Sequence, residues 1–79
     1  MSNLPSNWSG QIASAVSEHR KKGLIPYTLM LPVLWRPELS EFIRDRQINR
    51  MFGVARVGFE PDGTKIEVLP PPAEPISSS

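Results

Sequence analysis

The chain contains one long apolar run, Leu24-Ile-Pro-Tyr-Thr-Leu-Met-Leu-Pro-Val-Leu-Trp35, and the predicted fold is organised around it. None of its twelve residues is charged. Exposed apolar surface is unfavourable in water, so the run must be buried under its own chain or under a partner. A bilayer-spanning helix needs about 20 apolar residues, and Pro26 and Pro32 interrupt this run. The run therefore predicts the centre of a small domain.

Two conformations are open for this run. Its Tyr, Thr and Val residues favour a β-strand. Because Pro26 and Pro32 each remove a ladder donor, such a strand is expected at a sheet edge, or broken at Pro32. The alternative is a short helix that has Pro26 at its first position and ends before Pro32. We prefer the extended interpretation.

The segment before the run predicts a helix from about residue 7 to residue 22. Its apolar side recurs at steps of four, four and three, with Trp8, Ile12, Val16 and His19. Ser6 is the expected N-cap. Positive charge fills the last turn, and Gly23 follows where a left-handed residue commonly ends a helix.

A second helix is predicted after the run, with Pro37 at its first position. Leu39, Phe42 and Ile43 form a narrow apolar stripe. Ile48 points away from the face that Leu39 occupies, so this helix either buries two sides or ends near Arg46. Gly53 is expected to end the helical region.

The segment from residue 54 to residue 69 predicts a β-hairpin. Two apolar, strand-like stretches flank Glu60-Pro61-Asp62-Gly63, in which Pro61 and Asp62 suit the centre of a type I turn and Gly63 a bulge. An isolated hairpin is marginal in water, so the run at 24–35 is expected to supply a third strand. The prediction is a small α+β domain over residues 1–69, with the order helix–strand–helix–β-hairpin, a three-stranded antiparallel sheet and two helices. Residues 70–79 form an extended Pro/Ser-rich tail.

Composition limits the function. The chain has 79 residues and no cysteine, which excludes disulfides and thiolate zinc sites. The net charge of +1 is too mild to indicate nucleic-acid binding by itself. The first residues lack the basic and apolar regions of a secretion signal, so a cytoplasmic location is expected.

Catalytic signals are weak. His19 is the only histidine, and a place at a basic helix C-terminus explains it more simply than a role as base or metal ligand. Glu38, Glu41 and Asp45 are explained by a solvated helix face. The sequence has no P-loop, Rossmann glycine pattern or nucleophile elbow. We therefore expect no enzyme activity, no cofactor and no metal.

The preferred hypothesis is a non-catalytic protein-binding module, a small accessory subunit, inhibitor or other regulatory protein without a membrane partner. Aromatic residues, Met and Arg are enriched at the centres of interfaces. An edge strand near Pro26–Leu34 could pair with a partner's sheet or with a second copy in a homodimer. The predicted contact residues are Tyr27, Met30, Trp35, Arg36 and Arg44.

The alternative hypothesis is a winged-helix-like DNA-binding regulator. The order of its elements, a helix ending at Arg50 and then a hairpin, matches that of a recognition helix and a wing. This is a similarity of element order, without a family behind it. Interleaved acidic residues oppose it, because they repel phosphates. The predicted nucleic-acid contacts are Arg46, Arg50, Arg56 and Lys65.

Overall fold

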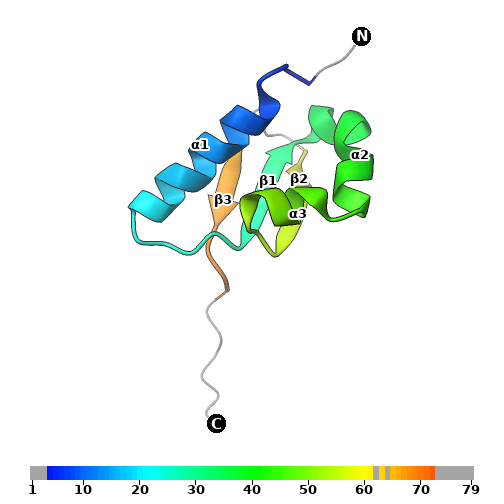
Figure 1. The fold of residues 1–79 in the computed structure, drawn as a ribbon. Helices are drawn as coiled ribbons and strands as arrows, with labels where there is room; N and C mark the ends of the chain where they lie inside the picture. The colour runs from blue at the N-terminus through cyan, green and yellow to red at the C-terminus, as the bar shows by residue number, and fades with distance from the viewer. Residues whose placement is uncertain (1–3, 62, 64, 73–79) are drawn as a thin grey trace.

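The computed structural model describes residues 4–61, 63 and 65–72. These form a small three-stranded sheet with helices packed across one face (Figure 1). In chain order the elements are α1 (Trp8–Lys21), β1 (Thr28–Pro32), a 3-10 turn η1 (Val33–Trp35), α2 (Arg36–Arg44), α3 (Gln47–Phe52), β2 (Arg56–Glu60) and β3 (Glu67–Leu69). The predicted α+β class is confirmed. The tail prediction falls largely on residues 73–79, outside the described part of the chain.

The apolar run supplies the central strand of the sheet. The strand order is β2-β1-β3, with β1 parallel to β2 and antiparallel to β3. The strand interpretation of the run is therefore confirmed. Of the two alternatives predicted for this strand, the position at an edge is wrong and the break at Pro32 is confirmed, because β1 ends at Pro32 and η1 follows. The all-antiparallel sheet and the β2–β3 hairpin are wrong. The physical reason is burial: β1 is the most apolar strand and occupies the centre, whereas the charged β2 and β3 occupy the edges.

The turn after β2 does form, but it leads to the opposite edge of the sheet. The Gly63 N–H donates a hydrogen bond to the Glu60 carbonyl at 3.2 Å, as expected for a turn over 60–63. The chain then continues to β3, beyond β1, so β2 and β3 do not pair. The chain from β1 to β2 passes through α2 and α3, as a parallel connection requires.

Pro32 is tolerated in the central strand because of where β3 ends. The antiparallel ladder pairs β3 only with Thr28–Met30, so it stops before Pro32. Consecutive residues of a strand point their N–H groups to opposite neighbours, so Pro32, two residues after Met30, faces β3 as Met30 does. At Pro32 no β3 residue needs the missing donor.

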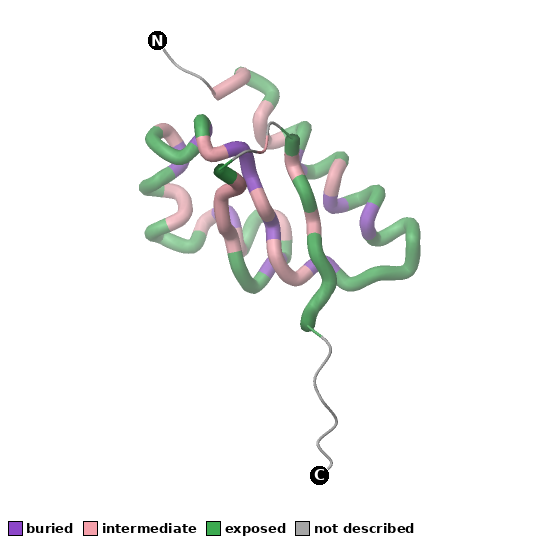
Figure 2. Tube along the Cα trace, turned by 180° about the vertical axis from the view of Figure 1, so that it is seen from behind, coloured by how far each residue is buried: buried purple, intermediate pink, exposed green. Residues whose placement is uncertain are grey.

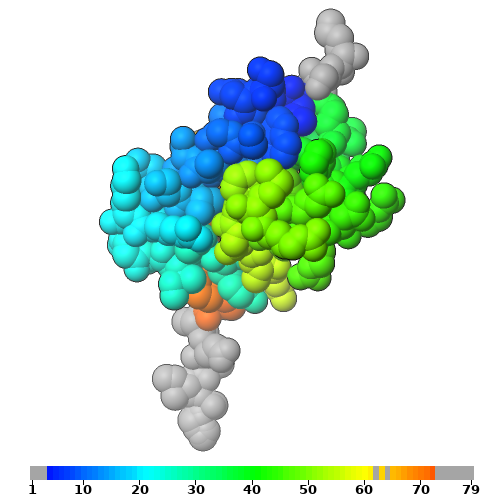
Figure 3. Space-filling model, in the orientation of Figure 1, coloured from blue at the N-terminus to red at the C-terminus, as the bar shows by residue number. Residues whose placement is uncertain are grey.

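The core lies between the sheet and the helices. Leu29 and Leu31 of β1 point to the helix side, and both are 0% exposed. In Figure 2 the sheet stands in front of the helices, and Figure 3 shows α3 packed between α1 and α2. The buried hydrophobic core consists of Ile12, Val16, Leu29, Leu31, Trp35, Leu39, Ile48 and Val54. The other face of the sheet carries no helix in the described structure.

The predicted first helix is confirmed to within one residue at each end, and Gly23 has the expected left-handed conformation at φ 81°. Its N-cap is Asn7, without a side-chain capping bond, and not Ser6. His19 lies on the buried face, where its Nε2–H donates to the Ile25 carbonyl at 3.2 Å. This hydrogen bond ties the chain entering β1 to α1.

The second helical region is divided at Arg46. Arg46 has φ 60°, the left-handed conformation, between the end of α2 and the start of α3. The break reorients the chain so that Leu39 and Ile48 both become fully buried. Of the two predicted alternatives, the helix that ends near Arg46 is the observed one. Gly53, at φ 66°, ends α3 as predicted.

Arg46→Gly is expected to raise the free energy of unfolding by about 1 kcal/mol, because a left-handed conformation strains residues with a Cβ and does not strain glycine. Urea denaturation followed by circular dichroism measures this change. Arg50→Gly, inside α3, is the matched control and should lower stability by up to about 1 kcal/mol. Equal losses in both variants would contradict the strain at Arg46.

Two carboxylates meet on the open face of the sheet. Glu60 on β2 pairs with Pro32 and Glu67 on β3 pairs with Met30, which places both side chains on the same face. The hydrogen bond that a protonated Glu60 carboxyl donates to Glu67 is the main cause that raises the pKa of Glu60 above its ordinary 4.5. Desolvation and the charge of Glu67 raise this pKa further, and Lys65 opposes the shift.

Glu60→Gln is expected to raise the melting temperature at pH 7 and to leave it unchanged at pH 3. A raised carboxyl pKa in the folded state contributes stability below the ordinary value of 4.5, and this contribution is lost as pH rises through the raised pKa. The neutral amide removes that loss. Thermal denaturation of both proteins from pH 3 to pH 8 measures the difference. A difference that is the same at every pH would contradict the coupling of Glu60 and Glu67.

Candidate strand-docking groove

The outer edge of β2 offers unpaired backbone groups. The Arg56 N–H donates to the Tyr27 carbonyl at 3.0 Å, which fixes the phase of the strand. Alternate residues of a parallel ladder face the same neighbour, so Gly58 also faces β1, whereas Val57 and Phe59 face away from it. Beyond β2 there is no further strand among the described residues. The N–H and C=O groups of Val57 and Phe59 are therefore available to an added strand.

The structure hollows along this edge, between β2 and α2. One hollow of about 350 Å³ is lined by Arg36, Ser40, Ile43, Arg44, Val57 and Phe59. An adjoining hollow of about 280 Å³ is lined by Ile43, Arg46, Asn49, Ala55, Arg56 and Val57. The two share Ile43 and Val57, so they form one feature, which we call the β2-edge groove. Its floor is apolar, because Val57 and Phe59 point to the helix side in register with Leu29 and Leu31.

Arginines surround this apolar floor. Arg36, Arg44, Arg46 and Arg56 line the groove, and all four are exposed. Arg56 pairs with Thr28, so its side chain leaves β2 on the face opposite to that of Val57. The Arg44 Nε lies 3.8 Å from Asp45 Oδ1, a loose contact between two exposed groups that contributes little. Within the described part of the chain the other three have no ion pair. The groove therefore combines positive charge with a half-buried apolar surface.

The five residues predicted to contact a protein partner lie in different parts of the structure. Arg36 and Arg44 lie in the groove. Trp35 is 6% exposed and belongs to the core, so its ring does not contribute to the candidate surface. Met30 lies on the open sheet face, where its Sδ covers Gly58. Tyr27 is half-buried, and its backbone bonds to both flanking strands.

Of the four residues predicted to contact nucleic acid, two lie in the groove and two lie outside it. Arg46 and Arg56 line the groove. Arg50 donates from Nη2 to the Asp45 carbonyl at 3.1 Å, across the α2–α3 break. Lys65 lies beyond β2, where its charge acts on Glu60. The groove thus joins two residues from each predicted set.

The apolar floor is what sequence reasoning missed. The sequence places Ile43 on an apolar helix stripe and Val57 and Phe59 in a strand-like stretch, without a role in binding. The alternation of Val57 and Phe59 with Arg56 and Gly58 is nevertheless visible in the sequence. That alternation separates the two faces of a strand, but it does not show that the strand ends the sheet. The edge position of β2 depends on the placement of β1 between β2 and β3.

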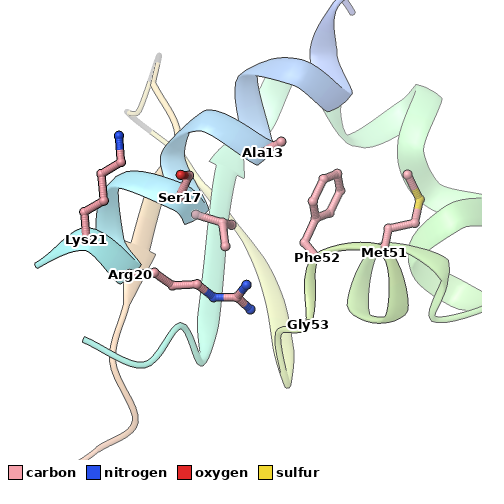
Figure 4. Close-up of a pocket in the computed structure, with 8 residues that line it drawn as sticks. Ala13, Ser17, Arg20, Lys21, Met51, Phe52 and Gly53 are labelled. Atoms are coloured by element: carbon pink, nitrogen blue, oxygen red, sulfur yellow. The ribbon is translucent and has the colours of Figure 1, made fainter. Parts of the chain in front are cut away.

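A separate hollow, of about 500 Å³, lies between α1 and α3 (Figure 4). Arg20 reaches from α1 toward Gly53, where a Cβ would lie 3.2 Å from its Nη2. This puts a cation at the C-terminal end of α3, which the helix dipole favours. A structural role therefore accounts for Arg20, and the hollow has no strand edge beside it.

The described residues contain no group of three or more His, Cys, Asp or Glu side chains that could hold a metal ion. No helix in that part of the chain has the length and hydrophobicity needed to span a bilayer. Comparison with known proteins found no matching protein family, curated protein or solved structure. The β2-edge groove is the candidate functional site of this chain.

Proposed function

We propose that this chain is a non-catalytic protein-binding module, an accessory or regulatory protein that holds an extended segment of its partner as an added strand beside β2. The observation that carries the proposal is the outward-facing backbone of Val57 and Phe59 above an apolar floor. In strand addition, main-chain hydrogen bonds supply affinity, and pockets for alternate side chains supply specificity. The β2-edge groove offers both.

Nucleic acid is the second candidate, because Arg46 and Arg56 line the same hollow and could contact phosphates. The winged-helix form of this hypothesis needs β2 and β3 to pair as the hairpin of a wing, but β1 lies between them. The groove also presents carbonyl acceptors and an apolar floor, which suit a peptide backbone and its side chains better than phosphates. The peptide is therefore the preferred ligand.

The experiment is affinity capture from host lysate, with and without nuclease, using the wild type and two tryptophan variants. Ser40→Trp places a large ring in the groove at an exposed helix position, so the fold should persist. Glu41→Trp is the matched control, because Glu41 is exposed on α2 but does not line the groove. We expect a nuclease-resistant protein that is captured by the wild type and Glu41→Trp, and at least tenfold less by Ser40→Trp.

Two results would overturn the proposal. Equal capture by Ser40→Trp and Glu41→Trp would show that the partner binds elsewhere. Capture that disappears with nuclease would move the assignment to nucleic acid. Circular dichroism of both variants checks that the fold is retained.

A further inference from the structure

We propose that the β2-edge groove selects an acidic segment of five residues in the pattern acidic-x-apolar-x-acidic, where x is any residue. This inference rests on the proposed function, because it requires the segment to bind as a strand beside β2. It adds the chemistry of the partner and the spacing of its side chains.

Helix α2 and strand β2 run in opposite directions along the groove. Arg36, at the start of α2, shares a hollow with Phe59, near the end of β2. Arg46, just after α2, shares the adjoining hollow with Ala55 and Arg56, at the start of β2. The helix therefore runs along the strand in the opposite direction (Figure 1). Its groove-lining residues follow the strand edge from end to end.

Two arginines, Arg36 and Arg44, lie on the side of α2 that lines the groove. Arg36, Ser40, Ile43 and Arg44 are four, three and one residues apart, so they share one face of the helix. Arg36 and Arg44 bound that face, about 12 Å apart at 1.5 Å per residue. Ile43 and the small Ser40 lie between them. The hollow of the groove beside Phe59 thus has a cation at each end of its helix side, with Ser40 and Ile43 between them.

The side chains of a strand added beside β2 would have a spacing that matches that of the two arginines. Its alternate residues point to the same side, so positions 1, 3 and 5 would face α2 together. Positions 1 and 5 are about 13 Å apart at 3.3 Å per residue, which matches the spacing of Arg36 and Arg44. An apolar side chain at position 3 would then lie over Val57 and Phe59. Carboxylates at positions 1 and 5 would meet the two arginines.

The test uses three labelled peptides that contain the cores Glu-Thr-Val-Thr-Glu, Gln-Thr-Val-Thr-Gln and Thr-Glu-Val-Glu-Thr, with the same flanking residues. The third has the composition of the first, but its acidic residues would face the other side of the strand. Fluorescence anisotropy at about 0.1 M salt measures binding to the full chain. We expect the first peptide to bind at least tenfold tighter than the other two. Arg36→Gln and Arg44→Gln should each remove most of that preference.

The outcomes separate the two proposals. If all three peptides bind equally and Ser40→Trp blocks them, the acidic pattern is overturned and strand addition stands. If Ser40→Trp blocks none of them, or none binds, both are overturned. If an unlabelled thymidine oligonucleotide displaces the first peptide at lower concentration than the unlabelled peptide itself, nucleic acid is the ligand and the peptide assignment is overturned.

Discussion

Trp35→Ala is expected to lower the free energy of unfolding by about 3–5 kcal/mol, the usual cost of removing a buried aromatic ring. A chain of this size has about 4–12 kcal/mol to lose. The ring ends η1, is 6% exposed and packs in the core, so its removal leaves a cavity at the junction of β1 and α2. Urea denaturation followed by circular dichroism measures the effect.

Leu34→Ala is the matched control, since Leu34 belongs to the same turn and is 58% exposed. Its effect on stability should stay within about 0.5 kcal/mol. If Trp35→Ala is as stable as Leu34→Ala, the ring is not part of the core, and Trp35 returns to the candidate contact surface.

The double charge reversal Arg36→Glu and Arg44→Glu is expected to weaken binding of the Glu-Thr-Val-Thr-Glu peptide by a hundredfold or more. Each change replaces an attraction at one end of the hollow beside Phe59 by a repulsion, and like charges brought together at an interface cost several kcal/mol. Both side chains are exposed, so the melting temperature should change little. Fluorescence anisotropy measures the affinity.

Lys21→Glu and Lys22→Glu together form the control for net charge. They change the charge of the chain by the same amount, at the exposed end of α1. A loss of affinity below about threefold is expected, because exposed charges separated by more than about 10 Å are largely screened at 0.1 M salt. Equal losses in the two double variants would mean that overall charge, and not the groove, attracts the peptide.

Local signals in the sequence predicted the elements of this fold well. The spacing of Trp8, Ile12, Val16 and His19 located α1, and the glycines at 23 and 53 marked helix ends. The arrangement of the strands was not predictable in the same way. Pro32 predicted either an edge strand or a break, and β1 does end at Pro32. The strand is nevertheless central, because β3 stops before Pro32 and no β3 residue needs the missing donor. The turn over 60–63 argued for a hairpin, yet a turn does not determine which strand the returning chain meets.

The candidate site was predicted only in parts. Exposed arginines were chosen correctly as surface residues, but they were divided between two hypothetical partners. Arg36 and Arg44 come from α2, Arg46 from the left-handed break and Arg56 from β2. They converge because α2 lies along the outer edge of β2, and this edge exists only because β1 occupies the centre of the sheet. Nothing in the local pattern around each arginine contains that information.

Hydrogen exchange of the β2 amides tests the central claim most directly, with and without saturating Glu-Thr-Val-Thr-Glu peptide. Gly58 faces β1, so its amide should exchange slowly in both states. Val57 and Phe59 face the free edge, so their amides should exchange fast in the free protein and be protected in the complex. A saturated complex in which Val57 and Phe59 still exchange as fast as in the free protein would contradict strand addition at β2.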